Sequence, residues 1–164
     1  MKEIMEKISS YNLFNYLLPG ALFAVIAERI SDYKIVQKDT VIGLLLYYFI
    51  GLVISRVGSL IVEPISKRVG FVVFSDYNDF VRASQDDAKI ELFSEINNMY
   101  RTLCSLFVVL LVLKIYSVAE SACGFIKDWG IYGVLILLLT MFLFAYRKQT
   151  EYIRKRVSAD NRDA

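Results

Sequence analysis

The stretch YNLFNYLLPGALFAVIAERI, residues Tyr11–Ile30, decides the class of this protein, because it places a Pro-Gly pair inside an apolar run. A helix that began at Pro19 would reach Glu28 after only about 14 Å, which is too short to cross a hydrocarbon core of about 30 Å. A membrane span must therefore begin before the proline and cover residues 13–30. Pro19 has no N–H to offer the carbonyl of Asn15, so the sequence predicts a kinked span with the kink at these two residues.

Composition supports a membrane protein. The chain has 164 residues, 56% of them hydrophobic, and its mean hydropathy is +0.46. Soluble domains average about 45–50% apolar residues. Three further stretches, residues 41–62, 102–119 and 129–146, are almost free of charge, and each has the length that a transmembrane helix needs, about 17–25 residues. The sequence predicts an all-α integral membrane protein, a single domain over residues 1–164 with four transmembrane helices and a helical cytoplasmic segment at about residues 63–101.

A cleaved signal peptide is the competing interpretation of the first apolar stretch. The segment before it carries both signs of charge, with Lys2 and Lys7 beside Glu3 and Glu6. No small-x-small cleavage site precedes a polar region, so these features favour a retained span. Residues 1–12 also place apolar side chains at helical spacing, which fits a short helix at the inner surface or a frayed polar tail.

The basic residues predict the orientation. With the N-terminus inside, 14 of the 19 Lys and Arg residues lie on the cytoplasmic side and 5 on the outer side. This asymmetry predicts a multi-pass protein with both termini in the cytoplasm. The expected outer connections are short, at residues 31–40 and 120–128, and Asp128 is expected to cap the last span.

The cytoplasmic segment should end in one long helix that continues into the third span, over Gln85–Ala119. Ser75 offers an N-cap for a shorter helix before it, and residues 69–74 fit a strand, a re-entrant stretch or apolar packing under the membrane. Along the long helix, apolar residues alternate at four- and three-residue spacing, which is the pattern of helices that pack on one another. We call these residues the seam, and they are Leu92, Ile96, Met99 and Leu103.

Small residues form a strip on one side of the second predicted span, and a charge lies among them. Gly51, Ser55, Gly58 and Ser59 would let another helix approach closely, with internal packing slightly favoured over packing with a second subunit. Arg56 is best explained as a charge near the inner face whose side chain extends to the headgroups. The functional alternative for Arg56 is the inner mouth of a pore or a ligand contact.

The residue types argue against catalysis by this chain. It has no histidine, and Cys104 and Cys123 fall in different predicted segments, so no transition-metal site, Ser-His pair or Cys-His pair is expected. The acidic residues between 76 and 95 alternate with basic and apolar ones, as on a solvated helical face. We expect no catalytic residues, no cofactor and no metal. The basic C-terminal segment is explained by membrane lipid, and nucleic acid is not expected as a partner of this chain alone.

The layout, with YNLFNYLLPG entering the first span and YNDFVRA…ELFSEINNMYR leading into the third, resembles small four-span proteins of bacterial anti-phage defence systems. The Kiwa-type membrane subunit is one candidate within that group. The resemblance implies an oligomeric subunit of the bacterial inner membrane, a sensor or effector that is coupled to a cytoplasmic protein partner and is not itself an enzyme. A small ion channel or transporter subunit is the alternative, although only one span is interrupted in its middle. A membrane enzyme acting on lipid is the third hypothesis, and it lacks convergent polar residues within the spans.

Overall fold

The structure, a computed structural model, describes residues 13–122 and 124–163. These residues form helices joined by loops and contain no strand, which confirms the all-α prediction. Anything expected of residues 1–12 or of Cys123 lies outside the described residues. The elements, in chain order, are the π-helical stretch η1 (Leu13–Leu17), α2 (Leu18–Ile30), α3 (Thr40–Val57), the π-helical stretch η2 (Gly58–Val62), α4 (Glu63–Arg68), α5 (Tyr77–Asp86), α6 (Lys89–Ala122) and α7 (Gly124–Asp163).

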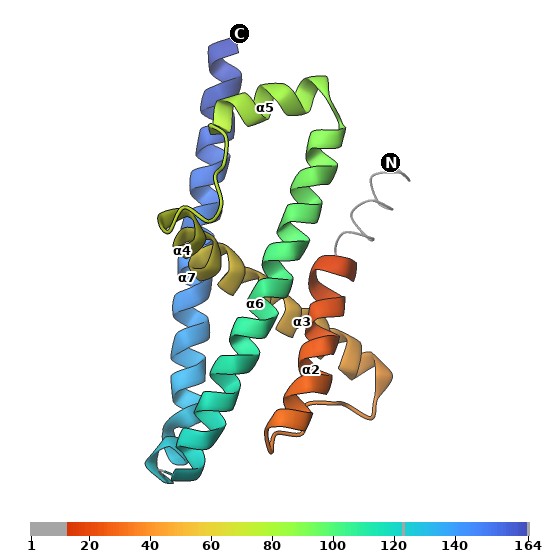
Figure 1. Cartoon of the computed structure of the whole chain (residues 1–164), viewed down its shortest axis with the longest axis vertical. Helices are drawn as coiled ribbons and strands as arrows, with labels where there is room; N and C mark the ends of the chain where they lie inside the picture. The colour runs from red at the N-terminus through yellow and green to blue at the C-terminus, as the bar shows by residue number, and fades with distance from the viewer. Residues whose placement is uncertain (1–12, 123, 164) are drawn as a thin grey trace.

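Two long helices, α6 and α7, set the shape of the molecule (Figure 1). They contact each other at one end and diverge toward the other, where α5 bridges them. On the far side of α6 lies α2, and α3 passes behind α6 from α2 toward α7. The apolar core forms where α2, α3 and α6 meet, around Ala27, Ile54, Leu106 and Leu110.

Three helical stretches are long and apolar enough to cross a membrane, namely Thr40–Arg68, Lys89–Ala122 and Trp129–Val157. They indicate a membrane protein with transmembrane helices. Among the described side chains of α7 only Ala145 is buried, so the long apolar surface of this helix faces outward. The stretch 13–30 is helical but is not among these three, and a fourth span stays a prediction.

Near Pro19, where the sequence predicts a kink, the structure shows a change in helix type. The π-helical η1 ends at Leu17, and α2 begins at Leu18, with Pro19 in its first turn. A proline is accommodated at this position because the first N–H groups of an α-helix have no partner within the helix. Because the turn before Pro19 is π-helical, no continuous α-helix runs through the proline.

Two glycines bring the backbones of neighbouring helices into contact. A Cβ atom added at Gly51 would lie 1.7 Å from the carbonyl oxygen of Tyr16, and one added at Gly20 would lie 1.7 Å from that of Tyr47. No side chain fits at either place. The junction of η1 and α2 with α3 therefore depends on glycine on both sides.

In the segment between α4 and α6, the structure excludes one of the alternatives left open for residues 69–74 and corrects two helix boundaries. Its residues 69–76 are loop, with no strand at Val69–Phe74. The N-cap of α5 is Asp76 in place of Ser75, and its side chain accepts a hydrogen bond from the N–H of Asn78 at 2.8 Å. The long helix begins at Lys89 and not at Gln85, because extended backbone at Asp87 ends α5 and the Asp87 carboxylate accepts the N–H of Lys89 at 2.9 Å.

The connection expected at residues 120–128 is also corrected. Helix α6 continues to Ala122 and α7 begins at Gly124, so Asp128 lies inside α7 and does not cap it. Polar residues at 120, 121, 127 and 128 suggested a loop, but they occupy the ends of two helices that extend beyond their apolar stretches.

Candidate functional site

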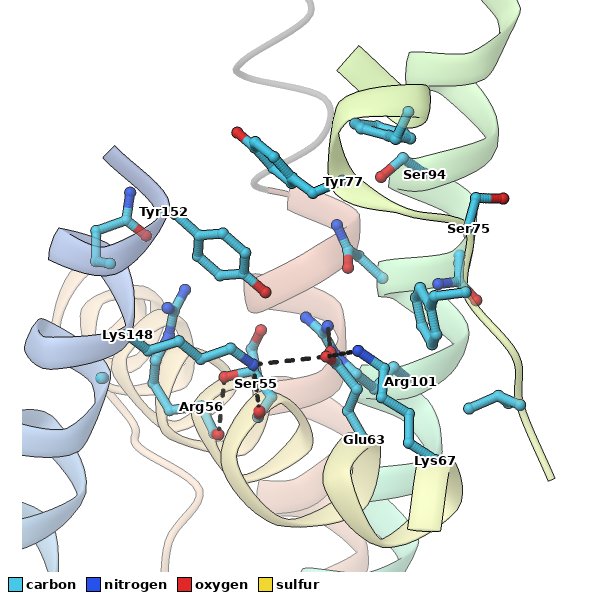
Figure 2. Close-up of a pocket in the computed structure, with 18 of the residues that line it drawn as sticks. Ser55, Arg56, Glu63, Lys67, Ser75, Tyr77, Ser94, Arg101, Lys148 and Tyr152 are labelled. Carbon is cyan, nitrogen blue, oxygen red and sulfur yellow. Dashed lines mark hydrogen bonds and ion pairs between the residues drawn. The ribbon is translucent and has the colours of Figure 1, made fainter. Parts of the chain in front are cut away.

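Three charged residues from three different helices meet at one point of the structure (Figure 2). Glu63 begins α4, Arg101 lies on α6 and Lys148 lies on α7. The Arg101 Nη1 atom is 2.5 Å from Glu63 Oε2, and Lys148 Nζ is 3.6 Å from Glu63 Oε1. Lys67, one turn further along α4, places its Nζ atom 3.0 Å from the same Oε1. One carboxylate therefore accepts three cations, in an arrangement that we call the Glu63 cluster.

The Glu63 cluster lies at the ends of the predicted apolar stretches. Glu63 directly follows the range 41–62, and Arg101 directly precedes the range 102–119. Lys148 lies two residues after the range 129–146. The carboxylate of Glu63 is buried, at 7% exposure. A buried carboxylate needs charged or hydrogen-bonding partners, and the cations supply them where the apolar parts of the helices end.

Lys148 also donates to a backbone carbonyl that Pro64, which has no N–H, leaves without a donor in the π-helical register. In the π-helical register of η2, each N–H bonds to the carbonyl five residues earlier, and the N–H of Glu63 bonds to the carbonyl of Gly58. The carbonyl of Ser59 would therefore need the N–H of residue 64. Pro64 has no N–H. The Nζ atom of Lys148 donates to the Ser59 carbonyl at 2.6 Å, so α7 is tied to the proline turn by its side chain.

A cavity of about 930 Å³ opens beside the Glu63 cluster. Its lining residues come from η1, α3, η2, α4, α6 and α7, together with the loop before α5 and α5 itself. Two contacts hold that cover: Lys67 Nζ lies 4.0 Å from the centre of the Phe74 ring, and the rings of Tyr77 and Tyr152 are 6.4 Å apart. The cavity thus joins the membrane helices to the α5 segment.

The small-residue strip contributes to both the packing and the cavity. Ser55 and Ser59 are both buried, and both line the cavity. A Cβ atom at Gly58 would lie 2.6 Å from the Ser105 hydroxyl of α6. Within this chain the strip therefore contacts η1 on one part, through Gly51, and α6 on another.

Arg56 and Asn15 each take part in a polar contact between helices. Arg56 lines the cavity, with its Nη2 atom 3.5 Å from the Tyr16 hydroxyl. Asn15 is buried, and its side-chain oxygen accepts a hydrogen bond from Thr102 of α6 at 3.0 Å. The π-helical stretch η1 is therefore connected to α6 by a buried polar contact.

The seam residues lie on α6 at different depths. Leu103 packs against the apolar core, Ile96 and Met99 are half-buried, and Leu92 is 52% exposed. Within the described chain, the seam thus loses its cover as α6 leaves the core.

The opposite ends of the helices carry a second, smaller set of polar contacts. The Tyr33 hydroxyl donates to the Glu120 carboxylate, and Lys114 Nζ donates to the Ile30 carbonyl at 2.8 Å. Burial, together with the Glu120 carboxylate, raises the pKa of the Tyr33 phenol above its usual value. These contacts fix the loop after α2 onto α6.

The sequence analysis did not single out Glu63, Arg101 and Lys148 as a group. All three lie beside the ends of apolar stretches, and this shared position could have predicted the cluster. Residues at the same membrane depth on packed helices can meet. In the part of the chain that the structure describes, no group of His, Cys, Asp and Glu is arranged to hold a metal ion. Cys104 is exposed on α6. Comparisons with protein-family models, curated proteins and solved structures found no match to this chain.

Proposed function

We propose that this protein is an oligomeric subunit of the bacterial inner membrane that serves as a sensor or effector in anti-phage defence and acts through a cytoplasmic protein partner. The layout of the sequence supports the defence role, and the three apolar helices support the membrane location. In this proposal residues 13–30 form a fourth span, and both termini lie in the cytoplasm.

The seam on α6 carries the proposal. Its covered end is Leu103, and its uncovered end is Leu92. Apolar side chains that continue a packed helical face into water are typical of helices that dock on another helix. We propose that a second copy of this chain covers Leu92, Ile96 and Met99.

The loop before α5 offers a separate surface for the partner. Phe71 and Val73 are 83% and 92% exposed, and Val69 beside them is exposed as well. The partner docks on this loop and supplies any chemistry that the system needs, including any contact with nucleic acid. The chain itself, which lacks histidine, acts by binding.

The test replaces Leu92, Ile96 and Met99 by Ser and measures two quantities, the molar mass of the detergent-extracted protein and the protection of cells against phage. We expect a smaller particle and loss of protection, with normal insertion into the membrane. The matched control is Glu91→Ser with Tyr100→Ser, two exposed positions of α6 outside the seam. An unchanged mass with full protection in the seam variant contradicts the proposal.

A small channel or transporter subunit is the second candidate, and the cavity lined by α3, α6 and α7 is the observation that favours it. A polar cavity between membrane helices is where such proteins hold their cargo. Ion flux into liposomes that contain only the purified protein distinguishes this function from the first.

A further inference from the structure

The cavity beside the Glu63 cluster is strongly basic. Five of its lining side chains are cationic, while Glu63 is the one acid among the described residues that line it. The cations come from α3, α4, α6 and α7, so they are brought together only by the fold. They are Arg56, Lys67, Arg101, Lys148 and Lys155.

Glu63 balances only one of these charges. It pairs with Lys67, Arg101 and Lys148, and a single carboxylate leaves the lining with an excess of four positive charges. Arg56 contacts the neutral Tyr16 hydroxyl. Walls of low dielectric weaken the screening of this excess, so the cavity attracts an anion.

The lining also provides neutral donors beside the cations. Ser94 of α6 lies beside the cations, and Ser75 and Tyr77 are also lining residues (Figure 2). The Nε atom of Arg101 is buried and has no hydrogen-bond partner among the described residues. Several cationic and hydroxyl donors around one space suit the tetrahedral oxygens of a phosphate group, and an arginine can bind two of them at once.

The size and position of the cavity narrow the ligand further. At about 930 Å³ it is larger than a bare phosphate and lies within the usual range of about 300–1,000 Å³ for small-molecule sites. It lies where the apolar ranges 41–62, 102–119 and 129–146 end. In the proposed membrane protein this is the level of the lipid headgroups, and basic pockets at that level bind anionic headgroups.

We infer that this cavity binds a phosphate group of net negative charge, which anionic phospholipid headgroups share with soluble phosphorylated compounds. The inference adds to the proposed function the class of ligand that the sensor binds. Its biological role rests on the proposed function, whereas binding itself does not. Binding in detergent is measured independently of oligomer size and phage protection, so either proposal can fail alone.

The experiment measures the unfolding temperature of the full-length protein in a neutral detergent. The probes are phosphatidylglycerol, zwitterionic phosphatidylcholine and inorganic pyrophosphate. We expect phosphatidylglycerol or pyrophosphate to raise the unfolding temperature and phosphatidylcholine to leave it unchanged. A shift with phosphatidylglycerol alone assigns a lipid source, and a shift with pyrophosphate assigns a soluble one.

The variant Arg56→Gln with Lys155→Gln removes two cavity cations that form no ion pair with Glu63. We expect its apparent affinity for the active probe to fall about 25-fold, about 5-fold for each charge. The matched control is Arg147→Gln with Arg156→Gln, which removes the same charge from exposed positions of α7 that do not line the cavity. If the double variant does not fold, Lys155→Gln alone, an exposed position, tests the same 5-fold loss.

Three results overturn the inference. The first is the absence of any shift with both phosphate probes, and the second is an equal shift with phosphatidylcholine. The third is an equal loss of affinity in the cavity and control variants, which would show that only the overall charge of the protein matters.

Discussion

At the scale of single residues, Glu63 is the carboxylate at which three cations from α4, α6 and α7 meet. It is buried at the start of α4 and accepts Lys67, Arg101 and Lys148 within 3.6 Å. Such a cluster costs free energy to desolvate, and its net effect on stability is small compared with the cost of removing one partner. Glu63 therefore holds together three cations that would otherwise repel one another.

We expect Glu63→Gln to lower the free energy of unfolding by about 2 kcal/mol or more, because it leaves these cations without a countercharge. Arg101 and Lys148 are 20% and 28% exposed, so solvent reduces the effect below that of a fully buried cluster. Denaturation of the purified protein in detergent measures the change.

The control for that measurement is Glu151→Gln, which breaks the exposed pair of Glu151 with Arg154 on α7. We expect no measurable change in the free energy of unfolding, because solvent screens an exposed ion pair. Equal losses in the two variants would show that the Glu63 cluster has no special role.

At the scale of elements, the contact of α3 with η1 and α2 depends on the absence of side chains. The Cβ position of Gly51 lies 1.7 Å from a backbone oxygen of Tyr16, and the backbone there cannot shift without moving a helix. Helices in a membrane associate mainly by close packing, so this contact decides how the first helix sits on the second.

We expect Gly51→Ala to lower the free energy of unfolding by about 1–3 kcal/mol, the usual range for overpacking. Gly133→Ala is the control, since no atom lies within 4 Å of a Cβ atom at Gly133. Alanine favours a helix over glycine by up to about 1 kcal/mol, so this control should be neutral or stabilising. Similar stability of the two variants would contradict the packing role of Gly51.

At the scale of the whole molecule, a separate set of polar contacts joins the helices at each of their two ends. The Glu63 cluster joins α4, α6 and α7 at one end, and Tyr33 and Lys114 join the loop after α2 to α6 at the other. Ends that share a polar cluster lie at a similar depth. This arrangement is consistent with a molecule whose α5 segment and C-terminus lie on the same side of a membrane.

We expect reporter fusions after Tyr33 and after Lys127 to report the outer side and a fusion at the C-terminus to report the cytoplasm. The reason is the sequence asymmetry of 14 inner to 5 outer basic residues. A C-terminal reporter on the outer side would contradict the four-span topology.

The sequence by itself determined the helical class, the apolar stretches and the unusual region around Pro19, because these depend on local composition and on the missing N–H of proline. Helix ends were less predictable where polar residues continue a helix beyond its apolar part, as at residues 120–128. Only the tertiary structure decided that Glu63, Arg101 and Lys148 meet and that Arg56 and Lys155 line the same cavity. Charge positions along a chain give the depth of a residue, whereas its neighbours depend on which faces of the helices pack together.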